Sequence, residues 1–134
     1  MDHSLQKAAQ RKAGIAARRA LSAAARSAAD AALCRRIAAL SCFQNARTLL
    51  AYAAFGGEAD LSALLAEAVQ QGKTVAYPIC GVGFTLTAAV PGPDGWEVGA
   101  YGIRTPILER AQLLPPEALD LVLVPCTAFD AACR

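Results

Sequence analysis

The sequence has few of the side chains that hold metals or act as catalytic bases. His3 is the only histidine, and the 5 cysteines include no C-x-x-C pair. A structural metal site needs clustered Cys and His ligands, and a nucleophilic thiol needs a nearby base. The cysteines are therefore expected to be free thiols that are buried or have no catalytic role. The sequence gives no reason to assign a metal ligand or a catalytic nucleophile.

The chain also lacks a long apolar run and a recognisable secretion signal. Of its 134 residues, 55% are hydrophobic and 18% are charged, and charge, Gly and Pro interrupt the apolar stretches too evenly for a membrane span. Residues 1–10 carry Asp2, His3, Ser4 and Gln6 where a signal peptide needs a basic end and an apolar block. We therefore expect a single soluble, cytoplasmic domain over residues 1–134 that does not associate with membranes.

The charge is distributed unevenly along the chain. Residues 1–40 contain eight basic and two acidic side chains, a net charge of +6, whereas the remainder has a net charge of −4. Lys7 and Arg11 are four residues apart and share one helix face, with Arg18 on nearly the same stripe. Such a row can bind a polyphosphate, although a solvated helix surface explains the same spacing.

Hydrophobic spacing predicts an α/β fold. Helices are expected at residues 5–21, 25–40 and 61–71, and strands at 47–54, 73–78, 84–90 and 121–125. Ser22 either closes the first helix or caps the second. The strand, helix and strand over 47–78 form a βαβ unit with parallel pairing, and 121–125 has the composition of a central strand covered on both faces. The alternation of strand-like and helix-spaced segments therefore predicts an α/β fold with N-terminal helices, and residues 96–106 are expected to be irregular.

Gly56, Gly57 and Glu58 follow directly after the first predicted strand. Ligands of open α/β sheets bind at the carboxyl ends of the strands, and Glu58 can accept hydrogen bonds from an aminopyrimidine ring. An acid that stabilises the start of a helix, with Asp60 as the cap, is the alternative explanation.

Two further groups of residues have a functional and a structural explanation. Asp130 follows the last predicted strand, where an acid can bind Mg²⁺ or a ribose but is at least as often part of a turn. Five aromatic residues can stack on a flat ring, although each is more often part of a core: Tyr52, Phe55, Tyr77, Phe84 and Trp96.

Six segments occur in the order of the landmarks of one enzyme family. They are residues 7–11 (KAAQR), 18–22 (RRALS), 51–60 (AYAAFGGEAD), 72–78 (GKTVAYP), 102–106 (GIRTP) and 120–130 (DLVLVPCTAFD). Together they resemble the 5-formyltetrahydrofolate cyclo-ligase family over nearly the whole chain. Thr105 stands where the family has Glu, and Cys126 stands where it has Gly.

The resemblance implies a fold, a function and a set of binding residues. The fold is a doubly wound, open, mostly parallel α/β sheet with N-terminal helices. The family uses ATP and Mg²⁺ to cyclise 5-formyltetrahydrofolate to 5,10-methenyltetrahydrofolate, a reaction in which positioning supplies most of the catalysis. Carried over by position, Lys7 and Arg11 match the contacts to the ATP phosphates. Ala53 and Glu58 match the contacts to the folate.

The family pattern continues past Arg134 with a glycine-rich loop, R-L-G-x-G-x-G-[YF]-Y-D-R, whose N–H groups would cradle phosphate. We therefore expect this chain to be truncated and inactive by itself. The main alternative is a non-catalytic nucleotide- or folate-binding remnant of the same fold. Nucleic-acid binding by the basic N-terminal helices is disfavoured, because they lack interleaved aromatic residues and acidic residues dominate after Leu40.

Overall fold

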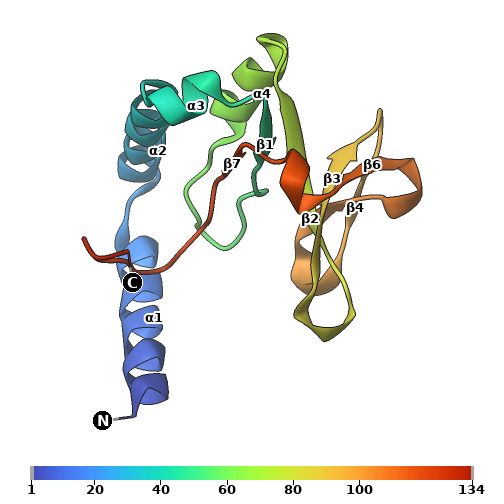
Figure 1. Ribbon diagram of the computed structural model, residues 1–134. Coiled ribbons are helices and arrows are strands. Elements are labelled where there is room, and N and C mark those ends of the chain that lie inside the picture. Colours follow the sequence, from blue (N-terminus) through green and yellow to red (C-terminus); the bar gives the residue numbers. More distant parts are fainter. Residues whose placement is uncertain (1, 134) are drawn as a thin grey trace.

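Helices form the N-terminal part of the molecule and one crossover within the sheet (Figure 1). The computed structural model describes residues 2–133. Its helices are α1 (His3–Ala20), α2 (Ala23–Ala38), α3 (Ser41–Asn45) and α4 (Ser62–Gln70). The three predicted helices are confirmed, whereas α3 forms in a segment where the helical spacing breaks and no helix was predicted.

A side-chain cap marks the start of each of the two long helices. The N–H of Ser4 donates to the carboxylate of Asp2 over 2.9 Å, and the N–H of Ala25 donates to the hydroxyl of Ser22 over 3.1 Å. Leu21 between the helices has extended backbone, so the chain changes direction there. Of its two predicted roles, Ser22 therefore takes the second and caps α2.

The strands form one five-stranded sheet and a separate two-stranded hairpin. The large sheet has the order β6-β3-β2-β1-β7. Its strands are β1 (Thr48–Leu50), β2 (Thr74–Cys80), β3 (Leu86–Pro91), β6 (Ala111–Leu114) and β7 (Leu121–Val122). β1 is parallel to β2 and β7, while β3 runs antiparallel to both β2 and β6. Every strand of the large sheet except β3 therefore points the same way, which confirms a mixed α/β fold with a mostly parallel sheet and N-terminal helices.

One strand prediction was too long and another was wrong. The segment 121–125 was predicted to be a strand, but β7 ends at Val122, and Val124 beyond it is 72% exposed. Among the described residues β7 lies at the edge of the sheet, so one side of this strand has no neighbouring strand here. The segment 96–106 was expected to be irregular, but β4 (Trp96–Val98) and β5 (Arg104–Pro106) pair as an antiparallel hairpin. Its strands are too short to produce a clear alternating pattern, and a 3₁₀ turn with Gly102 at φ 74° connects them.

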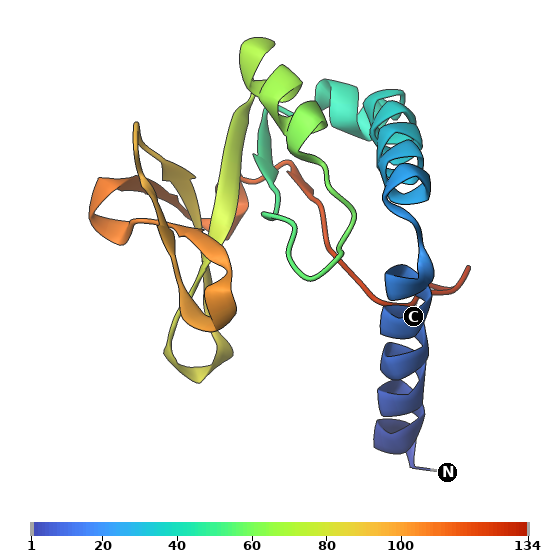
Figure 2. The same ribbon diagram turned by 180° about the vertical axis from the view of Figure 1, so that it is seen from behind.

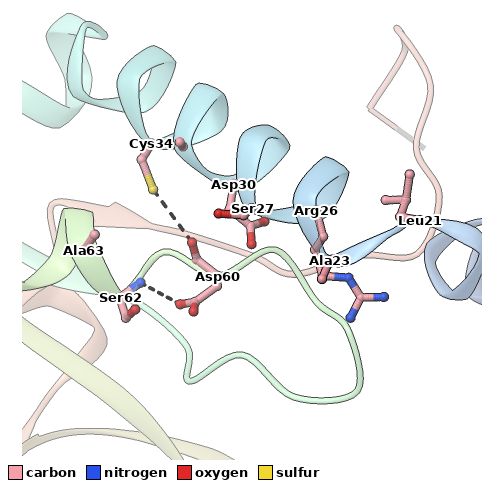
Figure 3. A pocket seen from close by; sticks show the side chains of 10 residues that line it. Leu21, Ala23, Arg26, Ser27, Asp30, Cys34, Asp60, Ser62 and Ala63 are labelled. Atoms are coloured by element: carbon pink, nitrogen blue, oxygen red, sulfur yellow. Dashed lines mark hydrogen bonds between the residues drawn. The ribbon is translucent and has the colours of Figure 1, made fainter.

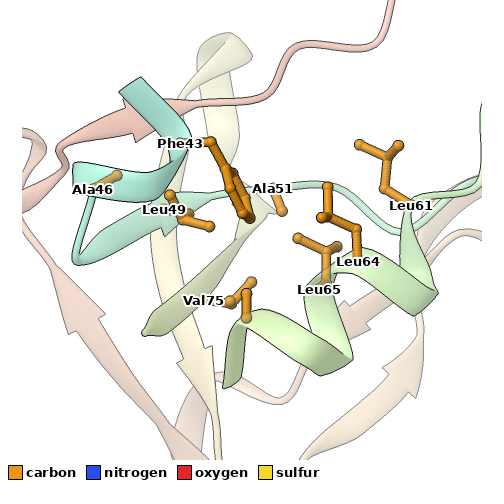
Figure 4. Packing of buried hydrophobic residues seen from close by; sticks show 9 residues of the cluster. Phe43, Ala46, Leu49, Ala51, Leu61, Leu64, Leu65 and Val75 are labelled. Carbon is orange, nitrogen blue, oxygen red and sulfur yellow. The ribbon is translucent and has the colours of Figure 1, made fainter. Parts of the chain in front are cut away.

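The hydrophobic core lies between α4 and the central strands (Figure 4). Leu64 and Leu65 of α4 face Leu49 of β1 and Val75 of β2, and Phe43 of α3 closes one end. Leu49 is fully buried. The βαβ unit predicted over residues 47–78 is thus the best-packed part of the molecule. In contrast, α1 and α2 contain no buried residue.

Asp120 attaches β7 to β1. Its carboxylate accepts hydrogen bonds from the N–H groups of Arg47 and Thr48, each over 2.9 Å, and its own N–H donates to the carbonyl of Thr48 over 2.9 Å. The two N–H bonds lower the pKa of the Asp120 carboxyl below its ordinary value of 3.8. Because hydrogen bonds to a charged carboxylate favour its ionised form, this contact fixes the start of β7 most firmly when Asp120 is charged.

We predict that Asp120→Asn lowers the thermal unfolding midpoint at neutral pH. A group whose pKa is lower in the folded state contributes stability above its unfolded pKa and loses it as the pH falls through the folded value. The difference between Asp120→Asn and the parent chain should therefore be largest above pH 3.8 and disappear in more acidic solution. Thermal unfolding followed by circular dichroism across this range measures it, with Glu117→Gln as the control. A difference independent of pH would contradict the assigned role.

Candidate ligand-binding site

The carboxyl ends of β1 and β7 lie side by side, because these strands are parallel neighbours. The loop after β1 and the segment after β7 therefore leave the sheet at the same edge. Figures 1 and 2 show that the segment after β7 crosses from the sheet to α1. This places the end of α1, the loop after β1 and the segment after β7 around one region, which is where ligands bind in open α/β sheets.

Two contacts hold α1 against the segment after β7. Nη2 of Arg18 donates to the carbonyl of Cys126 over 2.6 Å. One helical turn earlier, Gly14 lies so close to this segment that a Cβ there would collide with the carbonyl oxygen of Thr127. The absence of a side chain at residue 14 thus allows the backbone to pass directly over the helix.

A cavity of about 290 Å³ lies where these segments meet. The α1–α2 junction, the loop after β1 and the segment after β7 all contribute to its walls, through residues that include Arg18, Arg26, Tyr52, Gly57, Pro125 and Phe129. Arg26 is connected to α1, because its Nη2 donates to the carbonyl of Arg18 over 3.0 Å. Two guanidinium groups therefore border one cavity at the carboxyl edge of the sheet.

Tyr52 is an uncharged hydrogen-bonding group in this cavity. Its hydroxyl donates to the carbonyl of Ala59 over 2.8 Å. Burial raises the pKa of the Tyr52 phenol, the negative charges of Glu58, Asp30 and Asp60 raise it further, and Arg18 opposes them. The phenol therefore stays protonated at neutral pH, and its ring faces the cavity as a neutral surface.

The Gly56–Gly57–Glu58 turn adopts a conformation that suits its glycines. Gly56 and Gly57 have φ values of 61° and 82°, in the left-handed region that glycine favours. Glu58 closes the turn, because its carboxylate accepts from the N–H of Phe55 over 3.0 Å and its N–H donates to the carbonyl of Phe55 over 3.2 Å. The carboxylate of Glu58 is thus engaged within its own turn, while the flanking Gly57 and Ala59 line the cavity.

The structure separates the other predicted site residues. Lys7 and Arg11 are exposed on α1, and Arg11 precedes Arg18 by seven residues, about 10 Å along the helix axis. Neither lines the 290 Å³ cavity. Ala53 is half-buried in the loop after β1. The structure therefore brings the Glu58 turn next to Arg18 at the end of α1, and leaves Lys7 and Arg11 farther out on the same helix.

The aromatic residues singled out from the sequence lie at separate places. Tyr52 lines the cavity, whereas Tyr77 and Trp96 pack edge to face with ring centroids 4.6 Å apart, and Arg104 lies 4.7 Å from the Trp96 ring centroid. Phe84 is fully exposed at the tip of the β2–β3 hairpin. Of these residues, Tyr52 is the one placed to contact a ligand in the cavity.

A second cavity of about 620 Å³ lies on the other side of Arg26, between α2 and the start of α4 (Figure 3). Asp60 organises this side, because its carboxylate accepts from the N–H of Ser62 over 2.9 Å and its carbonyl lies 3.7 Å from the thiol of Cys34. Asp60 was predicted as the cap of this helix, but the N-cap position of α4 is Leu61, so Asp60 lies one residue earlier and accepts from the first N–H of the helix.

The side chains of residues 2–133 include no group of three or more His, Cys, Asp and Glu residues placed to hold a metal ion. Cys34 is half-buried and the other four cysteines are exposed, and all five are free. Across the same residues, no helix combines the length and apolar character needed to cross a bilayer.

Arg26 is one of the cavity residues that were not identified from the sequence. It is one of eight basic residues in the first 40, and its spacing does not distinguish it from the others. Its position follows from the capping of α2 by Ser22, which places Arg26 at the end of the first turn facing the loop after β1. The signal in the sequence that could have identified Arg26 was Ser22, a typical capping residue that lies between two basic helical segments.

We predict that Gly14→Ala displaces the segment after β7. Alanine favours the helix by about 1 kcal/mol, but overpacking against a backbone carbonyl typically costs about 1–3 kcal/mol, so the net effect should be destabilising. Amide hydrogen exchange should become faster over residues 125–129 while α1 remains helical. Ala13→Ser, an exposed neighbour, is the control and should leave this exchange unchanged. Unchanged exchange in Gly14→Ala would show that the segment does not depend on the close approach.

Comparison with known proteins supports one family. The sequence profile of the 5-formyltetrahydrofolate cyclo-ligase family matches residues 3–133. The fold is similar to the solution structure of Aquifex aeolicus 5,10-methenyltetrahydrofolate synthetase, with a TM-score of 0.79, 28% identity, and coverage of 92% of this chain and 62% of the relative. It is also similar to a 5,10-methenyltetrahydrofolate synthetase from Mycoplasma pneumoniae, with a TM-score of 0.71, 18% identity, and coverage of 96% and 66%.

The chain spans less than two thirds of the length of either relative. A comparison with curated protein sequences found no match. The family assignment therefore depends on the profile match, which covers almost every described residue, and the structural similarity agrees with it. The chain belongs to the 5-formyltetrahydrofolate cyclo-ligase family.

Proposed function

We propose that this chain is the folate- and ATP-binding part of an enzyme that cyclises 5-formyltetrahydrofolate to 5,10-methenyltetrahydrofolate. The observation that carries the proposal is the family match over residues 3–133, which includes all three segments that border the 290 Å³ cavity. The alternative is a binding protein of the same fold that has no catalytic activity. Thr105 and Cys126, which depart from the family pattern, are the observation that favours this alternative.

The proposed folate residues belong to the loop after β1. Glu58 and Ala53 lie in this loop, and the turn of Glu58 borders the cavity through Gly57. Within residues 2–133, the Glu58 carboxylate accepts a hydrogen bond from the N–H of Phe55. A carboxylate can accept several more, so Glu58 can bind the donors of an aminopyrimidine ring while it keeps its turn closed.

The proposed nucleotide residues are Lys7 and Arg11. Both side chains are exposed and lie on the helix that ends at the cavity. Positive charges on one helix face attract a polyphosphate, but flexible lysine and arginine stems position it only loosely. We therefore propose that Lys7 and Arg11 attract and orient the phosphates and take no part in proton transfer.

The proposed reaction between ATP and the folate determines what the protein has to do. When bound, ATP supplies the phosphoryl group that activates the formyl oxygen of the substrate. The chain holds the two ligands together and excludes water from the space between them, and no covalent protein intermediate is required. The side chains of residues 2–133 do not form a cage for Mg²⁺, so no step is assigned to a protein-bound metal.

We predict that the 134-residue chain alone does not produce methenyltetrahydrofolate. Positioning of the phosphates supplies most of the catalysis, and we place the glycine-rich phosphate cradle of the family beyond these residues. The assay follows absorbance with Mg-ATP on monodisperse protein. It compares the chain with a version joined to the part of the Aquifex aeolicus relative beyond the matched region.

We expect activity in the joined protein and no activity in the 134-residue chain. Robust turnover by the 134-residue chain would contradict the dependence on the cradle. Tight folate binding by a monodisperse joined protein without turnover would favour the non-catalytic alternative.

We also predict that Glu58→Gln in the joined protein weakens folate binding by about 1.5–3 kcal/mol, the range for a hydrogen bond to a charged group. Glutamine retains the size of the side chain and an acceptor for the N–H of Phe55, so the turn should remain intact. Glu67→Gln on the exposed face of α4 is the control. Titration calorimetry measures both, and equal affinity of Glu58→Gln and the parent would remove Glu58 from the folate site.

A further inference from the structure

Within residues 2–133, the hydrogen bonds that Arg18 and Arg26 donate do not neutralise their positive charges. Arg18 donates to the carbonyl of Cys126 and Arg26 donates to the carbonyl of Arg18, and both acceptors are uncharged. Nε of Arg26 is buried, and within residues 2–133 it has no hydrogen-bond partner. A buried donor without an acceptor is costly, so this guanidinium has unused capacity to bind an anion.

Gly57 brings the loop after β1 close to both arginines. A Cβ at this position would stand 3.5 Å from Nη1 of Arg26 and 3.6 Å from Cδ of Arg18. At Gly56, in contrast, a Cβ would meet no atom within 4 Å. The two glycines share the left-handed conformation, but only Gly57 faces the guanidinium of Arg26 and the side-chain stem of Arg18.

The charges of the two cavities differ in sign. The 290 Å³ cavity is lined by Arg18, Arg26 and a single acid, Asp30, so its lining is positively charged overall. The 620 Å³ cavity is lined by Arg26 with the acids Asp30 and Asp60, so its lining is negatively charged overall. An anion is therefore favoured in the smaller cavity and disfavoured in the larger one.

We infer that Arg18, Arg26 and Gly57 form an oxyanion-binding subsite that holds a phosphate or carboxylate group of a ligand. Complete small-molecule sites usually have volumes of about 300–1,000 Å³, so a cavity of about 290 Å³ suits one charged group of a larger ligand. Arginine is suited to this role because its planar fork matches both anions in a bidentate manner. The subsite adds a contact separate from Lys7, Arg11 and Glu58.

The source of the oxyanion depends on the proposed function. If that function is correct, the anion is either a phosphate of the nucleotide or a carboxylate of the glutamyl tail of the folate. Pyrophosphate is the probe for the first source. For the second, 5-formyltetrahydrofolate is compared with its pteroate analogue, which lacks the glutamyl group.

Titration calorimetry on the 134-residue chain at fixed ionic strength tests the inference. We expect Arg26→Gln to weaken binding of at least one anionic probe by about tenfold or more, the effect of losing a charged hydrogen bond. Arg19→Gln removes the same charge from the exposed side of α1 and should change the affinity by less than about twofold. Loss confined to pyrophosphate identifies a phosphate subsite. Loss confined to the glutamyl-bearing folate identifies a carboxylate subsite.

A second pair of variants keeps the test valid if Arg26→Gln unfolds. Gly57→Asp places a carboxylate against both arginines and should occupy the subsite, because Asp tolerates the left-handed conformation better than most residues. Gly56→Asp adds the same charge and the same backbone cost, but the side chain points into open space. We expect Gly57→Asp to weaken anion binding clearly more than Gly56→Asp.

Equal weakening by the two aspartates, or no binding of any probe by the parent chain, would overturn the subsite. The test measures binding, whereas the proposed function is tested by turnover of the joined protein. The two proposals can therefore fail independently.

Discussion

The arrangement of the site depends on the contact between the end of α1 and the segment after β7. Because α1 contains no buried residue, hydrophobic burial does not fix its position. The hydrogen bond from Arg18 to the carbonyl of Cys126 and the close approach at Gly14 fix it instead. Asp120 fixes the start of β7, the strand that leads into this segment, against the start of β1. The charged face of α1 thus reaches the carboxyl edge of the sheet through polar and backbone contacts.

This arrangement explains why the well-packed core and the candidate site are separate. The core between α4, β1 and β2 provides a rigid edge from which the loop after β1 extends. The site then forms from glycines, arginines and one half-buried tyrosine around that edge. Segments held by few apolar contacts open more easily than a core, so the site lies in the part of the molecule that a ligand can order.

The sequence predicted the features that repeat over many residues. Helical spacing located α1, α2 and α4, and the apolar runs located the βαβ unit and the turn of Glu58. The predictions failed where tertiary contacts decide the structure. The run Leu121–Pro125 has the composition of a buried strand and pairs with β1 as a strand should, but the strand ends at Val122. The role of Arg26 depends on a helix cap and on a loop 31 residues farther along the chain, which helical spacing alone does not predict.

The central claim is that the end of α1, the loop after β1 and the segment after β7 form one ligand site. Hydrogen-exchange mass spectrometry of the chain with and without 5-formyltetrahydrofolate and Mg-ATP tests it most directly. The account predicts that ligand slows exchange together over residues 14–21, 55–59 and 124–129, with little change in the β4–β5 hairpin. Protection confined to one of these segments, or centred on the hairpin, would contradict it.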